Sequence, residues 1–449
     1  MRSRRDARTG ERGESGSSGA PDRHWYGWLT VISLGGLLVN VTYVLVSKRH
    51  SLPAGDAFYY HYQANLIVQG KGWFIDPAVY LLKHHPIVPA AEHAPLWTVA
   101  LALADALGLR SYLAQLLWAC LVGAGAVAVT GLAAREVAGR RAGLIAAALA
   151  AAYPNYWLNT GTGLSETLVL LTVGAVVLLC YQLWKRPSVS KAAALGIACA
   201  FAALTRSELI LFVALVLVPT MLALRSITLR RRLALMGVGV LAALVIMAPW
   251  VGFNLARFSH PEFLSTELGS ALVTANCRPT YYGTKLGYWS LSCLSADPAS
   301  GDQSARDLQH RHFALEYVKA HESRLPVVLV ARVGREFGLY APLQQIRFDN
   351  HIEGRALVPI EIGLVMYYVM AITSVFGIFT LKRRGISVAP FIGILIEVVL
   401  TAVLLYGTTR FRTPLEVGLV VLTAVVVDDH LSHPRRNKDT EHLAPVVDG

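Results

Sequence analysis

Residues 163–184 are GLSETLVLLTVGAVVLLCYQLW, and after Glu166 this segment contains no charged residue. About 20 apolar residues in a helix cross the roughly 30 Å hydrocarbon core of a bilayer. Open strands would leave unpaired backbone groups in lipid, so such segments are predicted to be helices. The predicted fold class is an all-α integral membrane protein with about ten transmembrane helices, at residues 27–46, 111–133, 142–160, 163–184, 191–206, 208–224, 233–254, 357–381, 387–407 and 413–428.

The composition agrees with a membrane location. Hydrophobic residues make up 54% of the 449 positions and charged residues only 16%, whereas a soluble domain carries about 25% charged residues. An ordinary soluble domain is therefore excluded. The formal net charge of +12 is explained by cytoplasmic basic residues that face anionic lipid, so no nucleic-acid partner is needed.

The basic clusters predict the orientation, because short cytoplasmic loops retain Lys and Arg. Lys48 and Arg49 lie outside the first span and are the exception. Residues 94–109 are apolar but short, and they contain Pro95 and Asp105, so we expect them to lie in the outer interface as a helix. A model with both termini in the cytoplasm puts the remaining clusters on the cytoplasmic side, namely the arginines of the N-terminal tail and residues 135–141, 185–191, 225–232, 382–384 and 435–438.

This topology predicts three regions in a multi-pass protein of the plasma (inner) membrane. Residues 1–24 are expected to be a disordered basic cytoplasmic tail, residues 25–428 the polytopic domain, and residues 429–449 a second cytoplasmic tail. The outer segments 47–110 and 257–356 lie beyond the membrane on the far side. We expect these two segments to hold the chemistry, on the extracytoplasmic face.

Asp56 lies in the first outer segment, among Phe58, Tyr59 and Tyr60. A carboxylate suits the task of taking a proton from a hydroxyl group. Partial desolvation among these aromatic rings would raise the pKa of Asp56, although a nearby arginine would oppose that shift. Asp56 could instead only cap the helix that begins at Ala57, because Asp is favoured at such starts.

Arginines at the outer helix ends are candidates for binding a lipid phosphate. Arg410 and Arg412 lie before the last span, and Arg206 lies between the fifth and sixth spans. A guanidinium group makes paired, charge-assisted hydrogen bonds with phosphate, so we predict that Arg410 and Arg412 form a phosphate clamp. The alternatives are interfacial snorkelling for this pair and, for Arg206, an ion pair with Glu208 or Glu166.

Glu166 and His93 are predicted to support this site. Glu166 could face Asp56 and orient the acceptor or ligate a metal, or it could only favour the start of its helix. His93 could donate a hydrogen bond to phosphate. A divalent metal stays an open alternative, although no strong ligand spacing is present among the four histidines of the first outer segment, His61, His84, His85 and His93.

The second outer segment contains two further features. Cys277 and Cys293 are an even pair in an oxidising compartment, which predicts a disulfide. It would hold a loop whose aromatic residues could line a groove, or it would act as a structural staple only. Residues 324–339 have a basic amphipathic pattern, which predicts an interfacial helix with Arg332 and Arg335 toward the headgroups and with apolar residues toward the acyl chains, namely Val328, Val330 and Phe337.

The order of the motifs resembles the GT-C glycosyltransferases, the class that includes protein O-mannosyltransferases and lipid A aminoarabinose transferases. The resemblance extends over residues 27–428. It is carried by Gly55-Asp56, Tyr59, Ala64, Gly70, Glu92-His93-Ala94-Pro95-Leu96, Leu164-Ser165-Glu166, Ala203-Leu204-Thr205-Arg206, Ala248-Pro249-Trp250 with Asn254, residues 314–340 and Arg410-Phe411-Arg412-Thr413-Pro414.

The resemblance implies packed transmembrane helices with outer juxtamembrane helices, and the transfer of a sugar from a polyprenyl-phosphate carrier. Asp56 matches the acid taken as catalytic in such enzymes. Two departures stand out. Ala57 replaces a second acid that many relatives have, and His93 stands at the lysine of a Lys-Pro-Pro-Leu motif. The missing lysine leaves open how this segment binds the carrier phosphate.

The predicted function is that of an inverting glycosyltransferase acting on an extracytoplasmic acceptor, such as a cell-envelope glycan, lipid or protein. Asp56 is the predicted base, and the predicted substrate-binding residues are Glu166, Arg206, His93, Arg410, Arg412 and Tyr59. No Gly-rich phosphate loop is present, as expected for a donor without a nucleotide. The alternatives are a flippase of a lipid-linked saccharide, an envelope scaffold protein, and a polymerase or ligase of whole oligosaccharides.

Overall fold

The computed structural model describes residues 20–296 and 299–432. Within this part the backbone is helical, and its only strand-like feature is an isolated bridge between Ile75 and Pro89. The predicted tails lie mostly outside the described residues. Their described portions, residues 20–24 and 429–432, are helical. The all-α fold class is thus confirmed for the described chain.

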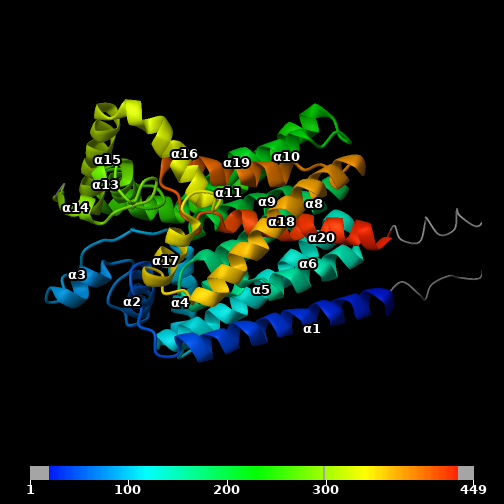
Figure 1. Ribbon diagram of the computed structural model, residues 1–449, viewed down its shortest axis with the longest axis horizontal. Coiled ribbons are helices and arrows are strands. Elements are labelled where there is room, and N and C mark those ends of the chain that lie inside the picture. The colour runs from blue at the N-terminus through cyan, green and yellow to red at the C-terminus, as the bar shows by residue number, and fades with distance from the viewer. Residues whose placement is uncertain (1–19, 297–298, 433–449) are drawn as a thin grey trace, which may run out of the picture.

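Each predicted span coincides with a helix or with a series of short helices. The long helices run side by side along the molecule, and both ends of the described chain lie at one end of it (Figure 1). The elements are α1 (Ala20–Tyr43), α5 (Tyr112–Ala138), α6 (Arg140–Ala152), α8 (Glu166–Lys185), α9 (Val189–Thr205), η3 (Ser207–Ile210) with η4 (Val213–Leu217) and α10 (Val218–Leu222), α11 (Leu229–Arg257), α18 (Leu357–Arg383), α19 (Ala389–Leu404) and α20 (Thr413–Ser432).

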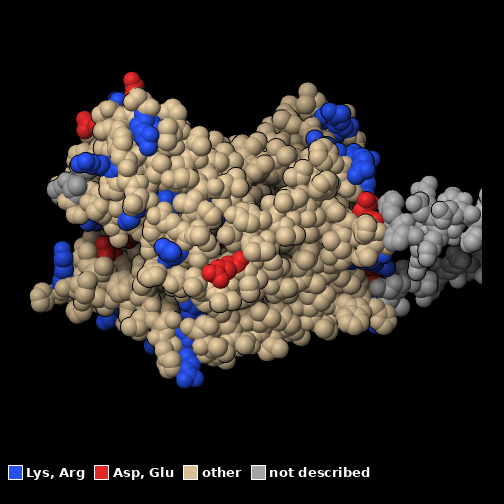
Figure 2. Space-filling view, in the orientation of Figure 1, with Lys and Arg blue, Asp and Glu red and all other residues tan. Residues whose placement is uncertain are grey.

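Five of these helical stretches are long and apolar enough to cross a membrane: Asp22–Lys48, Tyr112–Ala138, Glu166–Lys185, Leu229–Arg257 and Leu357–Arg383. Four further apolar helical stretches of the described chain are shorter, namely Leu96–Ala106, Val189–Thr205, Ser207–Leu222 and Ala389–Leu404. On the face shown in Figure 2, Lys and Arg gather toward the two ends of the molecule, and a band of uncharged surface lies between them. The count of about ten spans and the N-in, C-in orientation stay predictions.

Small residues let the long helices approach closely. The main core lies among α1, α5, α6, α8, α9, α18 and α20 and is built largely from Ala, Val and Leu. A Cβ on Gly196 of α9 would collide with the backbone of Gly239 in α11. Without a hydrophobic driving force between helices in lipid, such close contacts are a main source of helix association.

The two outer segments form one layer at the end opposite the termini (Figure 1). The backbone amide of Thr266 donates to Ala91, and Arg257 donates to the carbonyls of Phe74 and Ala90, which joins the segments. The first segment holds α2 (Asp56–Val68), α3 (Pro77–Leu82) and α4 (Leu96–Ala106); the second holds α12 (Leu268–Ala275), α13 (Arg278–Tyr281), α14 (Ser292–Ala296), α15 (Gln303–Ala320), α16 (Leu325–Glu336) and α17 (Pro342–His351).

Two sequence predictions about the outer segments have different outcomes. A disulfide joins Cys277 to Cys293. The prediction that Arg332 and Arg335 of α16 face the headgroups is wrong, because both side chains are buried. Arg332 donates to the carbonyl of Val403 in the last turn of α19, and Arg335 donates to the carbonyl of Leu286 in a loop, while Val330 is exposed. The predicted orientation of the helix is therefore wrong, because its two arginines face the interior of the protein.

Candidate active site

Asp56 is the first residue of α2 and follows Gly55, whose φ is +55°. Glycine tolerates this left-handed backbone conformation, so the chain can turn sharply into the helix. The N-cap position belongs to Gly55 rather than to Asp56. The Asp56 carboxylate contacts Arg410 and His93, so its position in the structure is that of a charged partner and not that of a cap.

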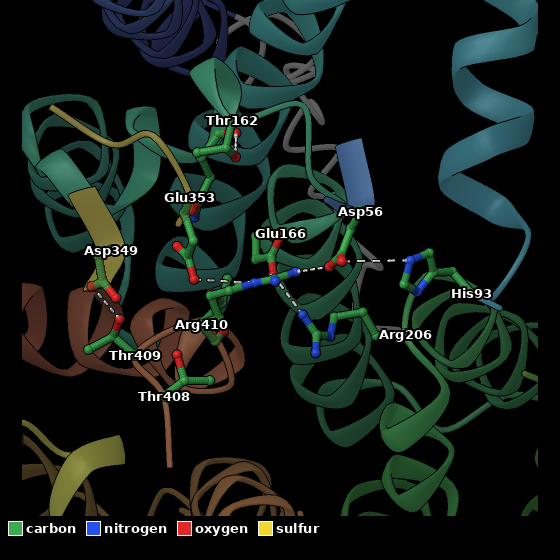
Figure 3. Close-up of polar contacts among 12 residues, drawn as sticks. Asp56, His93, Thr162, Glu166, Arg206, Asp349, Glu353, Thr408, Thr409 and Arg410 are labelled. Carbon is green, nitrogen blue, oxygen red and sulfur yellow. Dashed lines mark hydrogen bonds and ion pairs between the residues drawn. The ribbon is translucent and has the colours of Figure 1, made fainter. Parts of the chain in front are cut away.

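Arg410 joins the carboxylates of the site. Its Nη2 lies 2.9 Å from Asp56 Oδ2, and its Nε lies 2.7 Å from Glu166 Oε1. Arg206 approaches the same Glu166 oxygen with Nη1 at 2.6 Å and holds Glu208 with Nε at 2.5 Å. Figure 3 shows this row of alternating charges, with Asp56 at one end beside His93. The structure therefore brings the predicted residues Asp56, Glu166, Arg206 and Arg410 together.

Glu353 extends the row on the other side of Arg410, as Figure 3 shows. Its Oε1 lies 3.7 Å from Arg410 Nε, and its Oε2 lies 2.8 Å from Arg355 Nε. Sequence reasoning missed both residues. They lie in the turn between α17 and α18, where a Glu-Gly-Arg sequence carries no distinctive signal.

His93 connects the two outer segments. Its Nδ1 lies 2.8 Å from Glu267 Oε2, and its Nε2 lies 3.9 Å from Asp56 Oδ1. The imidazole packs against the rings of Tyr59 and Tyr60. Glu267, which directly precedes α12, was also missed by the sequence analysis.

Part of this row of charged groups lines a cavity of about 470 Å³, whereas Glu166 and Glu353 do not line it. The charged and histidine residues in its lining are Asp56, His93, Arg206, Glu208, Glu262, Glu267, Arg311 and Arg410. Its apolar lining comes from η3, the end of α19, the start of α12 and the loops around them. It includes Ile210, Leu211, Phe263, Leu264, Leu268, Leu404, Leu405 and Phe411.

Three predicted residues do not line this cavity. Glu166 is fully buried and contacts Arg206 and Arg410. Arg412 points into the helix bundle, where it is 2.9 Å from Glu416 and lies over the ring of Tyr367. It lines a separate, water-sized cavity, so the predicted clamp of Arg410 with Arg412 is not assembled. Tyr59 is buried and accepts a hydrogen bond from Gln63. Tyr60 lines the cavity in its place.

The charges determine the protonation of the site. Burial alone would raise the pKa of Asp56, but Arg410 and His93 outweigh it and hold that pKa well below its ordinary value. The expected rise from desolvation is therefore reversed. Burial would lower the pKa of His93, but Glu267 and Asp56 raise it to about 9. Burial raises the pKa of Glu353 to about 7, although Arg355 and Arg410 oppose the shift.

The described residues offer no set of ligands for a divalent metal. Among residues 20–296 and 299–432, no group of three or more His, Cys, Asp and Glu side chains could hold a metal ion. His61 is instead bound to Gln115, and His85 to the carbonyl of Tyr80.

Comparison with known proteins gives two kinds of match. Residues 92–253 match a family model described as dolichyl-phosphate-mannose-protein mannosyltransferase. The archaeal oligosaccharyltransferase AglB from Archaeoglobus fulgidus, solved with an inhibitory peptide and a dolichol-phosphate, matches with a TM-score of 0.57 and 15% identity, covering 96% of this chain and 53% of that chain. The apo form of the Archaeoglobus fulgidus oligosaccharyltransferase matches with a TM-score of 0.55 and 15% identity, covering 94% and 53%.

ArnT from Cupriavidus metallidurans, bound to undecaprenyl phosphate, gives a TM-score of 0.44 with 18% identity and covers 94% of this chain and 81% of that chain. No curated protein matches the sequence. The chain spans about half the length of the oligosaccharyltransferase chain that it matches. The matches confirm the resemblance to GT-C glycosyltransferases, and at these identities the solved structures establish the fold alone.

Proposed function

We propose that this protein transfers a sugar from a polyprenyl-phosphate carrier to a hydroxyl group of an extracytoplasmic acceptor, which is a cell-envelope glycan, lipid or protein. The observation that carries the proposal is the composition of one cavity. Carboxylate groups, guanidinium groups and an apolar wall face the same space, and these are the groups that a phosphate-linked sugar on a lipid requires. The enzyme would work in the plasma membrane, with the cavity at its outer face.

The apolar wall gives the lipid chain a route out of the cavity. Leu404 at the end of α19 is 57% exposed and Phe263 is 60% exposed, although both also line the cavity. Ile210 of η3 is likewise exposed. An apolar surface that continues from a charged cavity to the outside of a membrane protein suits a polyprenyl chain, because the chain can stay in hydrocarbon while its phosphate meets Arg410.

Arg410 would bind the phosphate and would also control the pKa of Asp56, the proposed base. In the structure its guanidinium group is shared among Asp56, Glu166 and Glu353. A bound phosphate competes for the same N–H donors. As Arg410 turns toward the phosphate, Asp56 loses its main stabilising cation and its pKa rises. Donor binding would therefore convert a weak base into a stronger one.

The proposed reaction is a single inverting displacement. The acceptor oxygen attacks the anomeric carbon, and its proton passes to the Asp56 carboxylate. The bond between the anomeric carbon and the phosphate oxygen breaks, and its electron pair stays on the leaving lipid phosphate. Arg410 and Arg206 stabilise the charge that develops there. Glu166 orients both guanidinium groups through its shared oxygen.

The test is sugar release from a panel of radiolabelled polyprenyl-phosphate sugars by the purified protein in lipid. We expect turnover with one donor, and we expect Asp56→Asn to lose it while donor binding remains. Asp105→Asn is a matched control, because Asp105 is a buried acid of α4 that pairs with Gln115 away from the cavity. Equal turnover in wild type and Asp56→Asn would refute the base, and binding of a donor without turnover would favour a flippase.

A further inference from the structure

We propose that Glu267 is a positioning residue, which accepts a hydrogen bond from Nδ1–H of His93 and keeps the imidazole doubly protonated, so that Nε2–H faces the phosphate of the donor. This inference rests on the proposed function and adds a residue from the second outer segment to it. Glu267 itself need not touch the reacting atoms, because it acts through the imidazole ring.

The geometry separates the two nitrogens of His93. Nδ1 lies 2.8 Å from Glu267 Oε2, a distance at which an N–H donates a hydrogen bond to a carboxylate. Nε2 is buried and has no hydrogen-bond partner, and its nearest charged atom, Asp56 Oδ1, is 3.9 Å away. Both His93 and Asp56 line the cavity. A buried donor without a partner costs free energy, and a phosphate oxygen in the cavity would remove that cost.

The surroundings of His93 favour its charged form. Burial would lower the pKa of the imidazole, but the Glu267 carboxylate outweighs it, with help from Asp56 and Glu92. The resulting pKa of about 9 keeps His93 protonated at neutral pH. The titratable groups around the ring come from α2, from the segment before α4 and from the start of α12, namely Asp56, Tyr59, Tyr60, Glu92 and Glu267.

The position of Glu267 is held by the packing of α12 on α15. The backbone amide of Gly269 donates to Asp307, and a Cβ at Gly269 would collide with the Asp307 backbone. The backbone that carries Glu267 is therefore fixed relative to α15. A fixed backbone position helps a side chain to orient its partner ring.

The deciding measurement is the pKa of His93. NMR would monitor its titration in protein that carries ¹⁵N- and ¹³C-labelled histidine in lipid, and the His93 signals would be assigned by their loss in His93→Gln. In wild type we expect His93 to be charged at pH 8. In Glu267→Gln we expect its pKa to fall by at least about one unit toward the ordinary 6.5, so that the signals of the doubly protonated ring are lost at a lower pH. An unchanged titration in Glu267→Gln would overturn the inference, whatever the activity.

Turnover against pH is the second readout. Near pH 6 the imidazole is charged in both proteins, so Glu267→Gln should approach wild-type activity. Near pH 8.5 we expect it to be about threefold less active or worse, because a smaller fraction of its His93 side chains is protonated. A loss of equal size at every pH would show a merely structural role. If wild type has no turnover, the proposed function fails, and the titration still decides the role of Glu267.

Glu316→Gln is a matched control. Glu316 of α15 also pairs with a histidine, at 3.0 Å from His312 Nε2, but this exposed pair lies outside the cavity. The substitution removes the same charge from the same outer segment. We expect neither the His93 titration nor the pH profile to change in Glu316→Gln, and a change of the same size as in Glu267→Gln would contradict the proposal.

Discussion

Replacing Arg410 by glutamine should destabilise the protein in a way that depends on pH. Arg410 holds Asp56, Glu166 and Glu353 at distances between 2.7 and 3.7 Å. Glutamine removes the charge and leaves three carboxylates close together. Glu166 is fully buried, so it cannot recover its solvation from water. Arg206 stays with Glu166, and Arg355 stays with Glu353, which limits the damage.

The expected cost follows from these partners. Removing one member of a buried ion pair costs about 3–5 kcal/mol, because the other charge is left uncompensated. Since Arg206 and Arg355 remain, we expect about 3 kcal/mol at pH 7, at the lower end of that range. Part of the lost stability comes from the rise in the pKa of Asp56, which costs about 1.4 kcal/mol for each unit.

The sign of the pH dependence can be worked out from Asp56. In wild type its pKa is held below the ordinary 3.8, so its contribution to stability is present above that value and is lost as the pH falls through the folded pKa. Arg410→Gln raises the folded pKa and removes this contribution at neutral pH. The difference between wild type and variant should therefore be steady near neutral pH and shrink as the pH falls below the raised folded pKa of the variant toward that of wild type.

The assay is unfolding in mixed micelles at several pH values, which gives a free energy without any need for activity. Arg384→Gln is the control, because it breaks an ion pair with Asp429 that is about one-third exposed. That pair should contribute at most about 1 kcal/mol. A cost for Arg410→Gln no larger than that of the control, or a cost independent of pH, would refute the idea that Arg410 holds the carboxylates together.

Three further predictions concern the surroundings of the site. Serine at both Cys277 and Cys293 should cost about 3 kcal/mol, the value for a loop of about 15 residues, and limited proteolysis should then cut the loop between them faster. Gly407 lies in the loop that carries Arg410, the proposed phosphate ligand. Gly407→Ala should cost about 1–3 kcal/mol and slow turnover in a donor assay, because the added Cβ would collide with the Arg332 carbonyl of α16. Leu404→Ser should raise KM about tenfold for a long polyprenyl donor and leave KM unchanged for a short-chain donor.

The sequence predicted the helices well and the site in part. Long apolar runs locate helices because the bilayer requires length and apolarity together, and each predicted span is helical in the structure. A charged residue at the outer end of an apolar helix is costly and indicates a functional role. This pattern predicts Asp56, Arg206 and Arg410 as site residues. Such patterns place a charge along the membrane normal, but they do not show which residues will meet.

The errors have physical causes. Arg410 and Arg412 are neighbours in sequence, yet their side chains leave the turn before α20 in different directions, one into the cavity and one into the bundle. His93 meets Glu267 across 174 residues, a pairing that only the folded outer layer creates. Arg332 was assigned to the surface because a buried arginine satisfied by backbone carbonyls has the same sequence pattern as an exposed one.

If Arg410 is shared between Asp56 and a bound phosphate, protonation of Asp56 and binding of the phosphate are thermodynamically linked. If phosphate binding raises the pKa of Asp56, then protonation of Asp56 must tighten phosphate binding by the same factor, because the coupling between two ligands of one protein is reciprocal. In the proposed reaction, Asp56 would carry the acceptor proton after sugar transfer, and the spent lipid phosphate would then be bound most tightly. Release of the carrier would have to wait for that proton to leave, so the departure of the lipid is the step to examine for the slowest rate.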